Sequence, residues 1–176
     1  MPASRSLPAL ALAVVLVGVA ACDSSVDEAC ALVDPPARTL VACVAGDVEV
    51  SVAAATTLLL SDVAEGGVEQ TTVDARGQTG ELRPAGLTVI LATAEGEAVA
   101  TGTYPVAEAL PLGVGGSFVN LSLPGLPAAP RTFTAVSGTV VVESVSAGGA
   151  VAGRLDVVAE DAAGRVEIEA RFRAEP

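Results

Sequence analysis

Hydrophobic and polar residues alternate most regularly near the C-terminal end of the chain, over residues 165–173. Apolar side chains take every second position there, and arginine or glutamate fills each position between them. The apolar positions are Val166, Ile168, Ala170 and Phe172. A period of two residues is typical of a β-strand that buries one face. We therefore predict a strand over 165–173, with Phe172 in the hydrophobic core.

Two further segments with strand character precede this one, at residues 139–146 and 151–160. The first is rich in valine, and the second alternates between apolar and mostly charged side chains. Glycine-containing loops at 147–149 and 161–164 separate the three segments, and glycine supplies the positive φ of a tight turn. The pattern predicts a three-stranded antiparallel meander over residues 139–173.

Shorter candidate strands occur upstream. They are residues 47–53, 68–73, 87–93, 99–104 and 117–121. The short loop at 94–98 predicts a hairpin between the two strands that flank it. For residues 53–65 the sequence allows either a helix or a strand, because the alanines and leucines favour a helix and the threonines favour a strand. Five prolines between residues 105 and 130 predict loops around a single strand.

Together, these elements predict an all-β fold, either an antiparallel β-sandwich or a barrel. Strands separated by glycine and proline turns, without helices between them, are typical of both architectures. The chain has no tryptophan, one tyrosine and three phenylalanines. Valine, leucine, isoleucine and alanine must therefore build most of the core.

The N-terminus has the order of a bacterial export signal. Arg5 lies before an uncharged apolar stretch at 9–21, which is shorter than the ~20 apolar residues of a transmembrane helix. Residues 19–22 read VAAC and resemble the lipobox of bacterial lipoproteins. The resemblance implies that residues 1–21 are removed as a lipoprotein signal peptide and that Cys22 receives a lipid. The alternative is an ordinary secretory signal in which Cys22 is incidental.

The lipobox also implies where the protein resides. It places the protein in the cell envelope, periplasmic or surface-exposed, and holds it to a membrane through Cys22. Asp23 resembles an inner-membrane retention signal of some bacteria, and the choice between inner and outer membrane stays open. We expect a flexible tether over 22–30 and a single β-rich domain over 31–176. Residues 40–43 (LVAC) have a similar form, but charged residues and prolines precede them, so we expect no processing there.

Two cysteines remain once Cys22 carries a lipid. Outside the cytoplasm, such a pair oxidises and persists as a disulfide. We predict a Cys30–Cys43 disulfide bond, which closes a loop of about 14 residues. In the chain-entropy model, such a bond stabilises the folded protein by ~3 kcal/mol. Two independent buried thiols are the alternative. With no histidine and no third free cysteine, the sequence predicts no metal site.

The predicted domain is strongly acidic. The whole chain has a formal net charge of −12, and the residues after Cys22 contain eight arginines, no lysine and all 21 carboxylates. Such a charge repels nucleic acids and anionic lipid surfaces, so we expect no nucleic-acid partner. Solubility is the simplest reason for this charge, and adaptation to high salt is another.

The sequence contains no recognisable catalytic constellation. Histidine, the commonest general base, is absent. Carboxylate pairs occur at Glu95/Glu97, Asp156/Glu160 and Glu167/Glu169. Such pairs could serve glycoside hydrolysis, but we expect them to lie on a solvated face. The Gly-Gly-Ser-Phe run at 115–118 lacks the strand–turn–helix setting of a serine nucleophile. We expect no cofactor.

Residues 133–172 contain a Gly-Thr-Val segment, then Gly-x-Val-x-Gly, then a final Gly-x-Val-x-Ile-x-Ala-x-Phe segment. This succession resembles the C-terminal half of uncharacterised bacterial β-rich lipoproteins. Ala170 stands where those proteins often have glycine. The resemblance implies a fold and a location, and it implies no activity.

We expect a non-catalytic, lipid-anchored envelope protein that acts by binding or as a structural component. Its partners are then the membrane, through the lipid on Cys22, and an unidentified protein of the envelope. Two alternatives stay open. One is an exported hydrolase that relies on carboxylates, and the other is a carrier of a small apolar ligand.

Overall fold

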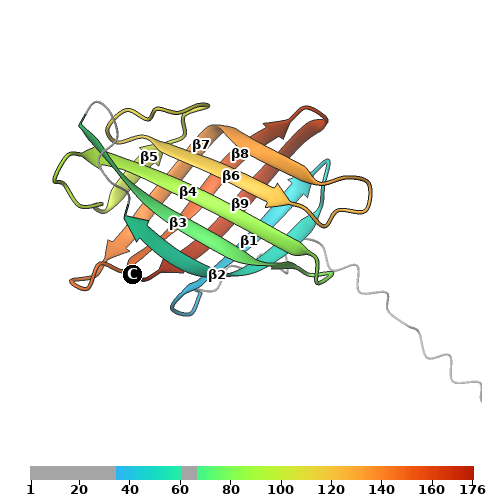
Figure 1. Ribbon diagram of the computed structural model, residues 1–176, viewed down its shortest axis with the longest axis horizontal. Coiled ribbons are helices and arrows are strands. Elements are labelled where there is room, and N and C mark those ends of the chain that lie inside the picture. Colours follow the sequence, from blue (N-terminus) through green and yellow to red (C-terminus); the bar gives the residue numbers. More distant parts are fainter. Residues whose placement is uncertain (1–34, 61–66) are drawn as a thin grey trace, which may run out of the picture.

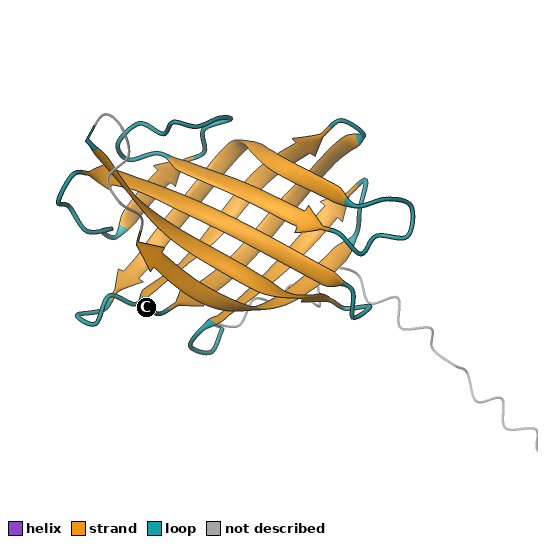
Figure 2. Ribbon diagram, in the orientation of Figure 1, coloured by secondary structure: helices purple, strands orange, loops and turns teal. Residues whose placement is uncertain are grey.

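A computed structural model describes residues 35–60 and 67–176 (Figure 1). Every regular element among them is a strand, so the predicted all-β class is confirmed (Figure 2). The strands are β1 (Thr39–Gly46), β2 (Val50–Leu60), β3 (Val68–Thr79), β4 (Pro84–Ala94), β5 (Gly102–Pro105), β6 (Ser117–Leu123), β7 (Arg131–Val145), β8 (Val151–Asp161) and β9 (Gly164–Ala174). The predicted signal peptide and tether fall outside the described residues.

The sheet closes on itself as an eight-stranded antiparallel barrel. Of the two predicted architectures, the barrel is therefore the correct one and the sandwich is not. The order around the wall is β7-β6-β4-β3-β2-β1-β9-β8, and β8 pairs again with β7. Closure removes the two edge strands that an open sheet would expose. The short β5 is a ninth strand. It pairs with residues 139–142 of β7, on the side where β6 pairs with residues 131–134.

The hydrophobic core lies inside the barrel, where alternate residues of each wall strand point inward. On β9, the predicted core positions are at most 1% exposed, and Phe172 and Phe133 are the largest fully buried side chains of the described residues. An eight-stranded barrel has an interior just wide enough for side chains to fill. Valine, leucine and alanine fill most of the remainder here. This filling leaves the ends of the barrel as the places where a ligand can reach the interior.

Glycines allow β7 and β8 to approach each other closely as they bend around the barrel. β7 contains two bulges, and Gly138 lies beside the first of them with a φ of 115°. A Cβ added at Gly138 would overlap the carbonyl oxygen of Asp156. A Cβ added at Gly153 would overlap the carbonyl oxygen of Val141 and lie 2.9 Å from Cζ of Phe172. Glycine at both positions therefore permits a backbone approach that any larger residue prevents.

Several predicted elements are confirmed. β7, β8 and β9 pair in succession as the predicted meander. The segments at 68–73, 87–93 and 117–121 lie within β3, β4 and β6. Residues 53–60 form part of β2, so the segment for which the sequence allowed either a helix or a strand is a strand as far as Leu60. Residues 61–65 lie outside the described part of the chain.

The predicted hairpin between residues 87–93 and 99–104 is wrong. β4 pairs with β3 and β6, whereas β5 contains only Gly102–Pro105 and pairs with β7. Both sides of β4 are occupied by longer strands. The loop at 95–101 therefore carries the chain to β7, where the shorter β6 leaves part of one side unpaired.

The strand predicted at 47–53 is confirmed only over residues 50–53, which begin β2. Residues 47–49 form the turn between β1 and β2, and the sequence did not predict β1. β1 has apolar residues on both faces, because Val41, Cys43 and Ala45 alternate with the inward-facing Leu40, Ala42 and Val44. A strand that is apolar on both faces shows no period of two, so its pattern gave no signal. The first half of β7, residues 131–138, also went unpredicted.

Candidate binding site

One end of the barrel opens into an apolar pocket, which we call the mouth. It lies where β3 begins, β7 turns into β8 and the chain ends, at the left in Figure 1. Its volume is about 340 Å³, near the lower limit of ligand pockets, which is roughly 300 Å³. Its lining includes Thr71, Ala98, Val99, Val145, Val151 and Pro176. Most of these side chains are apolar, so the mouth suits a small apolar group.

Polar side chains lie on the inward face of β3 and β4 near the mouth. Glu69 and Thr71 line it, and Thr93 is the cross-strand partner of Glu69. Glu69 Oε2 accepts a hydrogen bond from the backbone N–H of Gly96 at 3.1 Å. Thr93 Oγ1 is buried and has no hydrogen-bond partner within residues 35–60 and 67–176. An unpaired buried hydroxyl costs roughly 1–3 kcal/mol, so Thr93 would gain from a polar group nearby.

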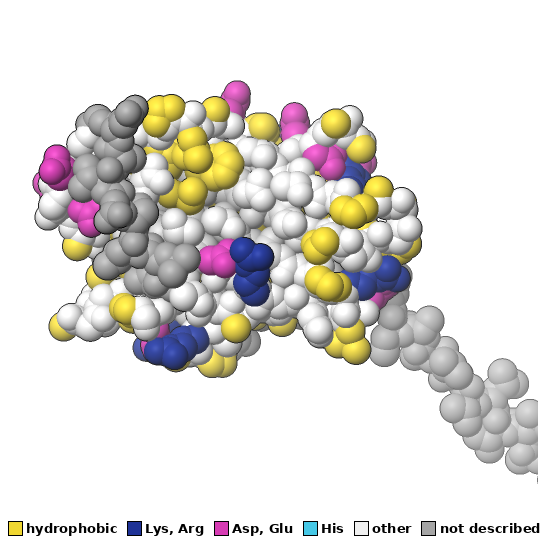
Figure 3. Space-filling view, viewed as in Figure 1, with side chains coloured by type: hydrophobic (Ala, Val, Ile, Leu, Met, Phe, Trp, Pro, Cys, Tyr) yellow, Lys and Arg dark blue, Asp and Glu magenta, His cyan; other side chains and the backbone are white. Residues whose placement is uncertain are grey.

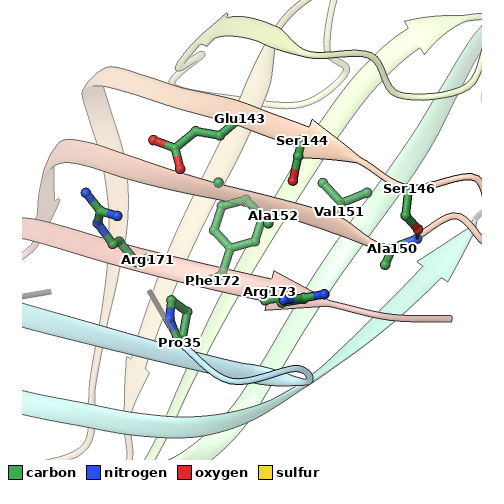
Figure 4. Close-up of a pocket in the computed structure, with 11 residues that line it drawn as sticks. Pro35, Glu143, Ser144, Ser146, Ala150, Val151, Ala152, Arg171, Phe172 and Arg173 are labelled. Atoms are coloured by element: carbon green, nitrogen blue, oxygen red, sulfur yellow. Dashed lines mark hydrogen bonds between the residues drawn. The ribbon is translucent and has the colours of Figure 1, made fainter. Parts of the chain in front are cut away.

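A second pocket lies on the outer wall at the same end of the barrel, and we call it the wall pocket (Figure 4). Its volume is about 240 Å³, and it lies between the end of β7, the start of β8 and the end of β9. Its lining includes Pro35, Glu143, Ser144, Ser146, Arg171 and Arg173. Val151 lines both pockets, so the mouth and the wall pocket are neighbours.

Arginines give the wall pocket positive charge. Arg171 and Arg173 flank Phe172 on β9, so their side chains project from the outer face of the barrel (Figure 4). Arg154 is the cross-strand partner of Arg171, and its Nε donates a hydrogen bond to Glu143 Oε1 at 3.1 Å. Like charges directly opposite each other on neighbouring strands repel. Glu143 offsets part of that repulsion, and an anion near Arg171 and Arg173 would offset more of it.

Ser117, in the glycine-rich run at 115–118, is a structural residue. It is fully buried, and its Oγ lies within hydrogen-bond distance of the carbonyl oxygens of Tyr104 (3.0 Å) and Pro105 (3.2 Å). The buried Tyr104 in turn donates its hydroxyl hydrogen to the carbonyl oxygen of Ala100 at 2.9 Å. These bonds hold β5 and the loop before it against the start of β6.

The predicted carboxylate pairs are solvated. All six side chains of the pairs at 95/97, 156/160 and 167/169 are exposed, the first pair in the loop after β4 and the others on the outer faces of β8 and β9. Acidic and basic side chains likewise lie on the outer surface of the face shown in Figure 3.

A bidentate ion pair between Arg131 and Asp161 joins the start of β7 to the β8–β9 turn. Arg131 Nε and Nη2 donate to the two carboxylate oxygens of Asp161 at 2.7 and 2.6 Å. Asp161 Oδ1 also accepts hydrogen bonds from the backbone N–H groups of Ala163 and Gly164, at 2.8 and 2.9 Å. The bond from Arg131, supported by these backbone bonds, holds the pKa of Asp161 well below its usual range. The predicted turn at 161–164 is therefore confirmed.

Cys43 is buried on the outer face of β1 and is disulfide-bonded. Its predicted partner, Cys30, lies outside the described residues, so the Cys30–Cys43 pairing stays a prediction. The lipid on Cys22 stays a prediction for the same reason. Within residues 35–60 and 67–176, no group of three or more histidine, cysteine, aspartate or glutamate side chains could hold a metal ion.

No family model, curated protein or solved structure matches the chain. Function must therefore be argued from the chemistry of the pockets. The described residues include no helix with the length and hydropathy of a membrane span.

Sequence reasoning missed both pockets. The mouth combines β3, the loop at 95–101, the β7–β8 turn and the C-terminus, which are far apart along the chain. The only local signal is an apolar residue beside a turn, as at Val99 and Val145. Such a residue occurs beside many turns that line no pocket, so the signal alone could not locate the mouth.

Proposed function

We propose that this protein is a non-catalytic binding protein, anchored to a bacterial membrane by a lipid on Cys22, whose mouth binds a small apolar group. The proposal rests on the apolar pocket at the end of an otherwise filled barrel. Barrel mouths are common sites for small ligands, and such sites are mostly apolar with a few polar groups that orient the ligand. The mouth combines Val99, Val145 and Val151 with the hydroxyl of Thr71.

The filled core limits the size of the ligand. Thr71 of β3 is paired with Leu91 of β4, and two residues further into the barrel Val73 is paired with Val89. Val73 and Val89 are fully buried, so the packed interior begins immediately behind the mouth. A long acyl chain has no room along the barrel axis. A compact apolar group of one or two rings, or the end of a chain, is the ligand class that fits.

The uncharged fluorophore N-phenyl-1-naphthylamine tests this ligand class. The full chain with Cys22→Ser, which lacks the lipid, should bind the dye saturably. Val145 is 37% exposed at the mouth, so Val145→Glu should fold and place a charge against the dye. We expect the dye's Kd to rise at least about tenfold, which corresponds to ~1.4 kcal/mol.

The matched control is Val114→Glu. Val114 is 61% exposed in the loop before β6, and it does not line the mouth. This variant should bind the dye like the parent chain. Equal Kd values for the Val145→Glu and Val114→Glu variants, or no saturable binding by the parent, would overturn the proposed role of the mouth.

The lipid anchor has its own test. In bacteria grown with radiolabelled palmitate, the parent chain should be labelled and should sediment with membranes. Cys22→Ser should lose the label and leave the membrane fraction, because its thiol acceptor is gone. A Cys22→Ser chain that stays labelled and membrane-bound would show that the anchor lies elsewhere.

A further inference from the structure

The wall pocket collects positive charge in a chain that is acidic overall. Two of the eight arginines after Cys22, Arg171 and Arg173, line it, and a third, Arg154, is the cross-strand partner of Arg171. Arg154 is paired with Glu143. Arg173 is exposed and has no carboxylate within 4.0 Å among the described residues. The cluster therefore has positive charge that the described carboxylates do not neutralise.

The groups around the wall pocket match the chemistry of an oxyanion. Guanidinium groups bind phosphate and carboxylate oxygens through paired, charge-assisted hydrogen bonds. Ser144 and Ser146 add hydroxyl groups to the lining. Ala152, whose cross-strand neighbours are Ser144 and Arg173, is small and leaves the space between them open. A phosphate group could reach the arginines without displacing a large side chain.

The position of the wall pocket along the chain points to the source of the phosphate. Pro35 lines the pocket, and it follows Cys22 by only 13 residues. A chain of that length spans at most about 45 Å even when fully extended. A lipid on Cys22 would therefore keep this wall near the bilayer, at an effective concentration on the order of millimolar. Even a weak site for lipid headgroups would then be occupied.

We propose that Arg171 and Arg173, with Arg154 beside them on β8, bind the phosphate groups of anionic lipids in the membrane to which Cys22 is attached. This inference rests on the proposed lipid anchor and is independent of the ligand in the mouth. The net negative charge of the protein does not prevent it, since charges beyond roughly 8 Å are screened at physiological salt. The arginines nearest the headgroups then dominate the local interaction.

One consequence is a fixed orientation of the barrel. The wall pocket and the mouth share Val151, so binding of headgroups in the wall pocket brings the mouth to the bilayer surface. The mouth would then receive its apolar ligand from the membrane rather than from solution.

Arginine footprinting on vesicles tests the proposal. The lipidated full chain is reconstituted in phosphatidylcholine vesicles with or without phosphatidylglycerol, and arginines are modified with phenylglyoxal and quantified by peptide mass spectrometry. We expect phosphatidylglycerol to slow the modification of Arg171 and Arg173 at least about threefold. Arg165, at the opposite end of β9 and also exposed, is the internal control and should react at the same rate in both vesicles.

Three outcomes would overturn the proposal. Arg171 and Arg173 could react equally in both vesicles, or Arg165 could be protected to the same extent, which would indicate nonspecific crowding at the surface. Inorganic phosphate with phosphatidylcholine vesicles could protect Arg171 and Arg173 while phosphatidylglycerol does not, which would assign the pocket to free phosphate. Failure of the anchor is distinguishable, because an unlipidated chain would not stay with either vesicle and its mass would show no lipid.

A substitution provides the second test. Arg173→Gln removes one charge from an exposed position and should leave folding unchanged. We expect it to reduce the protection of Arg171 by phosphatidylglycerol by at least half. Arg165→Gln, the matched control on the same strand, should leave that protection intact. Equal protection of Arg171 in both variants would contradict a shared phosphate site.

Discussion

Replacing Phe172 with alanine tests whether β9 lines the core of the barrel. Phe172 is 1% exposed, and its Cζ lies against Gly153 of β8. Core Phe→Ala substitutions cost about 3–5 kcal/mol, because transfer free energy is lost and a cavity remains. β9 is paired with β1 on one side and β8 on the other, so the backbone cannot move inward to fill the space. We therefore expect the upper part of this range, about 4–5 kcal/mol.

Thermal and urea unfolding of the full chain with Cys22→Ser, followed by circular dichroism, measures this cost. For a domain of this size, 1 kcal/mol shifts Tm by about 2–4 °C, so Phe172→Ala should lower Tm by about 8–20 °C. The matched control is Glu169→Ala. Glu169 is on the same strand but exposed on the outer face, so its loss should change stability by about 0.5 kcal/mol or less.

The pattern of the two variants decides the outcome. An unchanged Tm for Phe172→Ala would refute the assignment of this side chain to the core. A loss in Glu169→Ala together with no loss in Phe172→Ala would mean that the strand presents the opposite face to the interior. A measurable loss of only about 1–2 kcal/mol in Phe172→Ala would contradict the expected magnitude and would mean that the barrel collapses around the cavity.

Three further predictions concern the wall of the barrel and its disulfide. Gly153→Ala should destabilise the barrel by about 1–3 kcal/mol in urea unfolding, because the added Cβ overlaps β7 and overpacks the core; a stability equal to that of the parent would contradict the close approach. The pKa of Asp161 is lower in the folded state than in the unfolded state. Its carboxylate therefore stabilises the folded protein at any pH above the unfolded-state pKa of about 4, and this stabilisation is lost as the pH falls toward the folded-state pKa. Asp161→Asn should lower Tm at pH 7 and flatten the dependence of Tm on pH below 4, and a parallel pH profile would contradict the role of its bond with Arg131. Mass spectrometry of the alkylated, non-reduced protein should show no alkylation of Cys30 or Cys43, and alkylation of Cys30 would rule out the predicted pairing.

The C-terminal half of the fold was largely predictable from the sequence because its strands bury one face and expose the other. On β9 the arginines and glutamates face water while the alternating apolar residues face the core, so local pattern and tertiary environment agree. β8 has the same pattern, and Asp161 and Gly164 mark the turn between the two strands. The meander followed from these local signals.

The N-terminal half was less predictable because its environment departs from that pattern. β1 is apolar on both faces, and its last residue is followed by a polar turn at 47–49 that also alternates. β5 pairs with the strand that has backbone groups left unpaired along one side. Which strand this is depends on the closed barrel and not on the sequence of residues 87–104. The two pockets have the same origin, because each joins segments that meet only after the barrel closes.

The sequence by itself determined the all-β class, the face of the C-terminal strands that is buried, the acidic charge and the prediction of an anchor at Cys22. These properties follow from composition and from periodicity over a few residues. Only the tertiary structure decided that the sheet closes into a barrel, that its core is filled, and that Val99, Val145 and Val151 meet at the mouth. It also placed Arg171 and Arg173 beside Pro35. The physical reason is that closure and strand pairing are set by the packing of all strands at once, which no local pattern encodes.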